Sequence, residues 1–235
     1  EFICMLGRDS LYLETTDSKR DWHYHDFRDI DIQSYLLAAE ELTRRGYHVV
    51  RLGSLVREEF KTSNPMIIDY ATRKPNDFMD IYLTANCRFF ISCGTGLDGV
   101  ANAFRKPVAF VSYVPMEWGY TWNQTHIMIP KMHWLREEKR FMSFREILGS
   151  EVGFFRNTEQ FETMGIELKE NTPEQIRDVA VEMDERISGN WVKTEKDEEF
   201  QQRFLSLYLS SDRHGAHLSR IGSHFIGESF GTEGE

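Results

Sequence analysis

The chain has 235 residues, of which 40% are hydrophobic and 13% aromatic, a composition that supports a sizeable core and excludes a disordered protein. Its formal net charge of −10 argues against nucleic acid as a partner, because phosphate backbones bind basic surfaces. No apolar run reaches about 18 residues, so no transmembrane helix is expected. Three widely separated cysteines indicate buried free thiols in a reducing compartment. We therefore expect a cytoplasmic protein, which partners could hold at the inner face of a membrane.

The first half of the chain alternates between apolar runs of strand length and amphipathic helices. The predicted strands are 2–6, 47–52, 66–70, 89–91, 108–111 and 127–130. A helix capped by Asp29 or Asp31 runs to about Arg45, and Gly46 stands just past its end. Such alternation indicates a mostly parallel sheet with helices on both faces. We predict an α/β fold, a Rossmann-like, doubly wound domain over residues 1–150.

Further helices follow from cap residues and from helical spacing. Asn76 or Asp77 caps one of them, and its predicted apolar side holds Phe78, Ile81, Tyr82 and Ala85. Thr172 begins another, with Pro at the first helical position, and a last helix starts at Thr194. We predict that residues 151–235 form C-terminal helices that pack on the first domain, with a frayed end from Gly231.

The predicted strand 89–91 ends in the turn Gly94-Thr95-Gly96, and a short helix through Phe104 follows it. A helix N-terminus presents free backbone N–H groups and a positive dipole, and glycine lets an anion approach closely. The turn is therefore a candidate phosphate site. Glycines that serve only the geometry of a strand–turn–helix crossover are the alternative.

Two arginines follow the first two predicted strands, Arg8 after strand 2–6 and Arg51 at the end of strand 47–52. Ligands of open parallel sheets bind at the carboxyl ends of the strands, and guanidinium groups pair with diphosphate oxygens. Surface cations or structural ion pairs are the alternative. Neither Gly-x-Gly-x-x-Gly nor Gly-Lys-Ser/Thr is present, which argues against a dinucleotide site and against a P-loop.

An aromatic-rich segment at 115–134 includes Trp118, and such rings can stack on the sugars of a binding cleft. A long loop anchored to the core by its aromatic side chains is the alternative. Asp9, Tyr70 and Asp77 are further candidates for contacts to a sugar or a base.

The histidines do not indicate a metal site. His23 and His25 beside Asp26, and His214 with His217, have spacings that could hold a metal, but neither pair has the cysteines or the HExxH context of a zinc site. We predict no metal and solvated loop histidines. No Gly-x-Ser-x-Gly elbow or Cys–His pattern points to covalent catalysis, and no catalytic residue is identified.

Characteristic segments lie along most of the chain: Arg8-Asp9-Ser10, Tyr35, Gly46-Tyr-His-Val-Val-Arg-Leu-Gly53, Ile68-Asp-Tyr70, Asp77-Phe-Met-Asp-Ile-Tyr-Leu83, Cys87-Arg-Phe-Phe-Ile-Ser92, Gly96, Phe104-Arg-Lys-Pro107, Glu170-Asn-Thr-Pro-Glu174 and Arg220-Ile-Gly222. Together they resemble a family of bacterial glycosyltransferases of GT-B type found with cell-surface polysaccharide genes. The segment at Arg8 and Asp9 is also similar, more distantly, to the arginine motif of fucosyltransferases.

The resemblance implies that the chain is the C-terminal, donor-binding half of a GT-B enzyme. It implies a nucleotide-sugar donor, transfer to a hydroxyl of a glycan or protein acceptor, and no bound metal or other cofactor. By this likeness, Arg8, Arg51, Gly94, Thr95 and Gly96 contact the donor diphosphate.

A GT-B enzyme has two Rossmann halves, whereas this chain, which lacks an initial Met, is expected to hold one. Gly7 also stands where a bulkier residue or a histidine is expected before the arginine. The acceptor site and the catalytic base are therefore expected in an N-terminal half or a partner chain, and the protein could form a homo-oligomer. Two alternatives stay open: a non-catalytic Rossmann domain that binds a sugar or a protein, and a sugar-nucleotide-modifying enzyme such as an epimerase.

Overall fold

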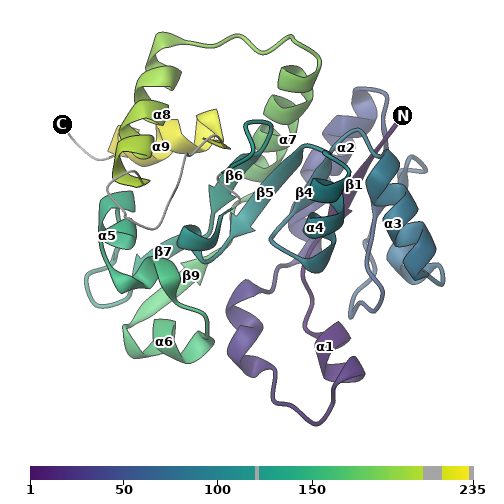
Figure 1. The fold of residues 1–235 in the computed structure, drawn as a ribbon, viewed down its shortest axis with the longest axis horizontal. Coiled ribbons are helices and arrows are strands. Elements are labelled where there is room, and N and C mark those ends of the chain that lie inside the picture. The colour runs from purple at the N-terminus through teal and green to yellow at the C-terminus, as the bar shows by residue number, and fades with distance from the viewer. Residues whose placement is uncertain (120–121, 209–218, 233–235) are drawn as a thin grey trace.

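A computed structural model describes residues 1–119, 122–208 and 219–232. Within them, a central sheet of seven parallel strands has the order β10-β6-β5-β4-β1-β2-β3 (Figure 1). The strands are β1 (Phe2–Leu6), β2 (His48–Arg51), β3 (Ile67–Asp69), β4 (Phe90–Ser92), β5 (Val108–Tyr113), β6 (Ile127–Pro130) and β10 (Arg220–Ile221). Strands β2 and β3 follow on one side of β1, and β4, β5, β6 and β10 follow on its other side. The predicted α/β, Rossmann-like fold is thereby confirmed.

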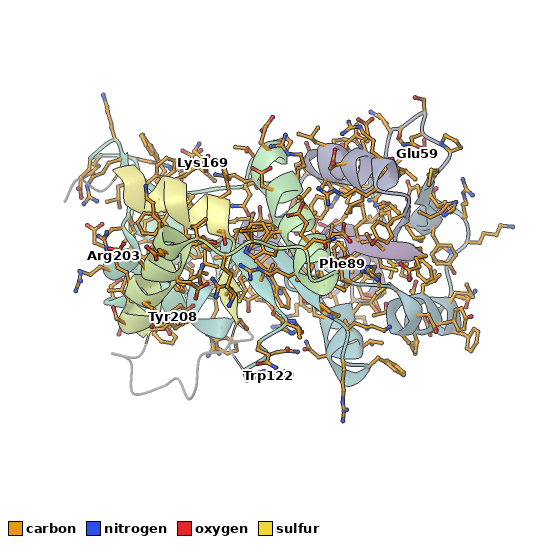
Figure 2. All side chains as sticks on the ribbon, turned by 90° about the horizontal axis from the view of Figure 1, so that it is seen from above. Glu59, Phe89, Trp122, Lys169, Arg203 and Tyr208 are labelled. Atoms are coloured by element: carbon orange, nitrogen blue, oxygen red, sulfur yellow. The ribbon has the colours of Figure 1, made fainter. Side chains whose placement is uncertain are left out.

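Helices cover both faces of this sheet. On one face α2 (Leu36–Arg44) packs against α7 (Pro173–Ile187), and on the other α3 (Asp77–Asn86) packs against α4 (Gly96–Ala103). Seen from above, the sheet lies between these layers, and the fully buried Phe89 lies in the interior (Figure 2). Strands buried on both faces are continuous apolar runs. All six residues of β5 are buried, for example.

Local sequence sets the ends of the helices much as expected. The Asp31 carboxylate accepts the Gln33 amide at the start of a 3₁₀ turn (Ile32–Tyr35) that leads into α2. The Asn76 side chain accepts the Met79 amide at the start of α3. Gly46, past the end of α2, has a φ of +94°, a conformation that glycine adopts without strain.

The predicted apolar side of α3 is wrong. Phe78, Ile81 and Tyr82 are 71%, 46% and 50% exposed, whereas Asp80 and Thr84 face inward. Hydrophobic spacing identifies the helix, but its orientation depends on what the neighbouring elements leave room for. The outer face of α3 therefore carries exposed aromatic side chains, and its inner face carries polar groups.

A second, smaller sheet lies beside the first and was not predicted. It is antiparallel, with the order β8 (Arg140–Phe141), β7 (Met132–Leu135), β9 (Ile166–Lys169). Short helices α5 (Phe144–Leu148) and α6 (Thr158–Thr163) accompany it, with a 3₁₀ turn at Glu151–Phe154 between them. Residues beyond 150 thus supply strands β9 and β10 as well as helices, and the domain boundary at residue 150 stays a prediction.

The C-terminal segment completes the central sheet. Helices α8 (Glu195–Tyr208) and α9 (Ser223–Thr232) flank β10, which pairs with β6. The outward-facing amide and carbonyl of Ile221 bond to the side-chain amide of Gln201, at 3.1 and 2.6 Å. Of the expected frayed end, Gly231 and Thr232 belong to α9, and residues 233–235 lie outside the described residues.

Candidate functional site

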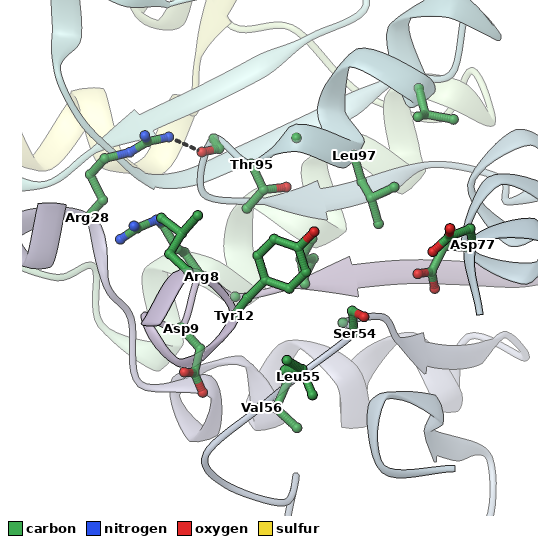
Figure 3. A pocket seen from close by; sticks show the side chains of 18 of the residues that line it. Arg8, Asp9, Tyr12, Arg28, Ser54, Leu55, Val56, Asp77, Thr95 and Leu97 are labelled. Atoms are coloured by element: carbon green, nitrogen blue, oxygen red, sulfur yellow. Dashed lines mark hydrogen bonds between the residues drawn. The ribbon is translucent and has the colours of Figure 1, made fainter. Parts of the chain in front are cut away.

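A cavity of about 720 Å³ lies at the carboxyl ends of β1, β2 and β4. Strand order reverses between β1 and β4, and this reversal is where open α/β sheets bind their ligands. We call it the switch-point cavity. Arg8, Arg28, the glycine turn (Gly94, Thr95 and Gly96) and apolar side chains of α3 and α4 line it (Figure 3).

The glycine turn connects β4 to α4 at the edge of the cavity. Gly94 has a φ of +91°, and a Cβ atom there would lie 2.9 Å from the ring of Tyr113. A Cβ atom at Gly96 would meet nothing within 4 Å, so the backbone of Gly96 faces open space. Glycine at position 94 thus serves the fold, whereas glycine at position 96 keeps the start of the helix accessible.

A capping box occupies part of this helix N-terminus. The Asp98 carboxylate accepts the Thr95 amide at 2.5 Å and the Thr95 hydroxyl at 3.2 Å. Burial raises the pKa of Asp98 to about 6. Since Thr95 is already bonded, the first-turn amides of Gly96 and Leu97, which have no intrahelical acceptor, are the ones available to an anion.

Arg28 is the cation that sequence reasoning missed. It ends a 3₁₀ turn (His23–Arg28), and its guanidinium donates to the carbonyl oxygen of Gly94 (Figure 3). Within the described ranges it makes no ion pair with a carboxylate, and its Nε atom is buried without a partner. A charge placed in this way is available to a bound anion.

Arg8 lines the cavity as predicted from its place after β1. Its side chain is mostly buried, donates to Asp29 at 2.5 Å and also donates to the carbonyl oxygen of His25 at 2.9 Å. The pKa of Arg8 is lowered by burial, although Asp29 opposes that shift. The positive charge of Arg8 in the cavity is therefore already paired with Asp29. Arg28 forms no such ion pair with a described residue.

His25 lies between these two arginines and also lines the cavity. Burial, together with the charges of Arg8 and Arg28, lowers its pKa to about 4. The imidazole is consequently neutral near pH 7 and adds no positive charge to this end of the cavity.

Arg51 does not join this group. Its side chain is 2% exposed, donates to the carbonyl oxygen of Glu58 at 2.7 Å and pairs with Asp69 at 3.3 Å. It lines an adjoining, smaller cavity of about 310 Å³, whose lining also includes Arg8 and Asp9. The structure gives Arg51 the role that the alternative interpretation described, a structural ion pair between β2, β3 and the connection that follows β2.

The other candidate residues are divided between the cavity and distant places. Asp9 lines the cavity and accepts the amides of Leu11 and Arg57, while Asp77 lines it as an exposed side chain on α3. Tyr70 lies outside it and accepts the Asn76 amide at 3.1 Å. Trp118 also lies outside it.

The aromatic segment around Trp118 packs against the 3₁₀ turn Glu151–Phe154 and α5, and Trp118 does not line the cavity. The guanidinium of Arg156 lies over the Trp118 ring, 3.8 Å from the ring centroid. The main-chain carbonyl oxygen of Trp118 accepts a hydrogen bond from the Tyr113 hydroxyl. Trp118 and Trp122 are 47% and 56% exposed, so these two rings do not anchor the segment in the core.

Potential metal ligands do not gather in the described part of the chain, where no group of three or more His, Cys, Asp or Glu side chains could hold an ion. His23 bonds to Asp26 at 2.9 Å instead, and His214 and His217 lie outside the described residues. None of the helices described has the length and apolar character of a membrane span.

Comparison of the chain with protein-family models, with curated proteins and with solved structures finds no match.

Proposed function

We propose that the chain binds a nucleoside diphosphate sugar in the switch-point cavity and is the donor-binding half of a GT-B type glycosyltransferase. The observation that carries this proposal is that Arg28, which forms no direct ion pair with a described carboxylate, and the open first turn of α4 at Gly96 line one cavity. The cavity is large enough for a nucleotide, since ligand pockets usually measure about 300–1,000 Å³.

In the proposed reaction, the bond between the sugar C1 and the diphosphate oxygen breaks while a bond forms from C1 to an acceptor hydroxyl. Negative charge then develops on the departing diphosphate. Arg28, the amides of Gly96 and Leu97, and the paired Arg8 would stabilise it, and donors preorganised toward developing charge are usually the largest catalytic contribution. The binding site for the acceptor, a glycan or a protein hydroxyl, and the base that takes its proton would lie in an N-terminal half or a partner chain.

Calorimetric titration with nucleoside diphosphates tests this proposal, together with a hydrolysis assay on the corresponding sugar nucleotides. We expect binding, and turnover that depends on an acceptor and on a second Rossmann half. Absence of binding by every diphosphate would contradict the proposal and favour a non-catalytic domain. Acceptor-independent conversion of the sugar nucleotide would instead indicate a modifying enzyme such as an epimerase.

A further inference from the structure

Asp80 is a buried carboxylate that no group in the described residues neutralises. It lies on the inner face of α3, is 8% exposed, and lines the switch-point cavity. Its Oδ1 atom is fully buried without a hydrogen-bond partner, and its side chain forms no ion pair with any described residue. Buried polar atoms nearly always have a partner, so this oxygen requires a donor that the described residues do not supply.

The position of Asp80 in its helix does not by itself explain this burial. The helix dipole favours a carboxylate in the first turn. Asp77, which stands in that turn and is exposed to water, already provides one. Burial, and the nearby charge of Asp77, raise the pKa of Asp80. The carboxylate is therefore held in an unfavourable place that faces the cavity.

Asp80 shares the first turn of α3 with Asp77, whose charge acts on it. Figure 3 shows Arg28 and Asp77 on opposite sides of the cavity, with Leu97 between them. Apolar side chains of Ile81, from α3, and of Leu97 and Val100, from α4, line the cavity near Asp80. One end thus suits an anion, and the other offers apolar walls for a flat ring and an acceptor for its edge.

We propose that Asp80 turns its carboxylate into the cavity and recognises the guanine base of a guanosine diphosphate donor by accepting its N1–H and 2-amino groups, an inference that rests on the proposed function. Guanine presents two adjacent donors on one edge, which match the two oxygens of a carboxylate. Adenine and cytosine place a ring-nitrogen acceptor beside their amino group, and uracil flanks its single N–H with two carbonyl oxygens. Each of those edges would direct a lone pair at Asp80.

The test measures dissociation constants calorimetrically for the whole chain, with GDP, IDP, UDP and 2′-deoxy-GDP as probes. IDP is the sharpest comparison, because inosine keeps the N1–H and lacks only the 2-amino group. We expect GDP to bind about tenfold or more tightly than IDP, as for the loss of one hydrogen bond to a charged group. This comparison needs no variant and does not depend on how a mutant folds.

Asp80→Asn should weaken GDP binding about tenfold to a hundredfold and bring the GDP and IDP constants together. Asp197→Asn is the matched control, because Asp197 is also 8% exposed, stands in the first turn of α8 and does not line the cavity. It should leave both constants unchanged.

The outcomes separate this inference from the proposed function. If the diphosphates bind but GDP and IDP bind equally, or if Asp80→Asn binds GDP like the wild type, the guanine assignment is wrong while the donor site stands. If 2′-deoxy-GDP rather than IDP loses affinity, the contact belongs to the ribose and the assignment is again overturned. If no diphosphate binds, the proposed function fails and the subsite fails with it.

Discussion

Replacing Gly96 with valine should abolish nucleotide binding without harming the fold. A Cβ atom at this position meets nothing within 4 Å, and Gly96 is not among the residues with positive φ. Valine is also no worse than glycine in a helix interior. The free energy of unfolding should therefore change by less than about 1 kcal/mol.

The bound state is affected differently, because the new side chain occupies the space next to the first-turn amides of Gly96 and Leu97. A hydrogen bond to a charged group is worth about 1.5–3 kcal/mol. Losing both would weaken binding by about 3 kcal/mol or more, at least roughly a hundredfold in the dissociation constant.

The matched control for this experiment is Gly99→Val. Gly99 belongs to the same helix, would also accept a Cβ atom with no neighbour within 4 Å, and does not line the cavity. Titration with GDP and urea unfolding should be run on both variants. Wild-type affinity in Gly96→Val, or equal losses in the two variants, would refute the phosphate site at the start of α4.

Arg28→Gln removes the unpaired cation and should weaken diphosphate binding by about 1.5–3 kcal/mol, measured by titration; an unchanged constant would contradict its role. Arg51→Ala leaves Asp69 without its charge partner and should lower the free energy of unfolding by about 3–5 kcal/mol in urea, whereas a fully stable variant would mean that the pair matters little. Asp98 has a folded-state pKa of about 6 against 3.8 ordinarily, so its protonated form is favoured by folding and its contribution should be lost as pH rises from 3.8 through 6. The stability difference between wild type and Asp98→Asn should accordingly fall by about 3 kcal/mol over that range, and a constant difference would exclude the titration. Binding should survive EDTA, because amides and guanidinium groups supply the positive charge; loss on chelation with recovery in Mg²⁺ would show a metal requirement.

The strands of the central sheet could be predicted because a parallel strand buried on both faces is written as an uninterrupted apolar run. In a chain without an apolar segment of membrane length, a run such as the one that forms β5 indicates a buried strand. The two-residue β10 and the short strands of the second sheet carry no such signal, since their pairing depends on contacts with residues far away in sequence.

The site was predictable only in part, for the same reason. Arg8 and the glycine turn could be placed because they follow strands, and all strand ends of a parallel sheet meet at one edge. Arg51 also stands at the end of a strand, but it forms an ion pair with the carboxylate of Asp69 on the adjacent strand. Arg28 reaches Gly94 across 66 residues from a 3₁₀ turn that no pattern indicates. Asp80 was hidden because spacing assigned the opposite face of α3 to the interior.

The side chain of Gln201 gives the last strand of the sheet an unusual neighbour. Its amide accepts from and donates to the backbone of Ile221 as another strand would, so the outer rim of β10 has no unused group at that residue. Exposed strand rims recruit further strands, either from other copies of a protein or from unfolded chains. Here a residue of helix α8 blocks the addition of a further strand by hydrogen bonding to the backbone of β10, and not by steric exclusion. An assembly of this protein with itself or with a second Rossmann half could accordingly not extend the sheet through the backbone of Ile221 unless Gln201 gave up both bonds.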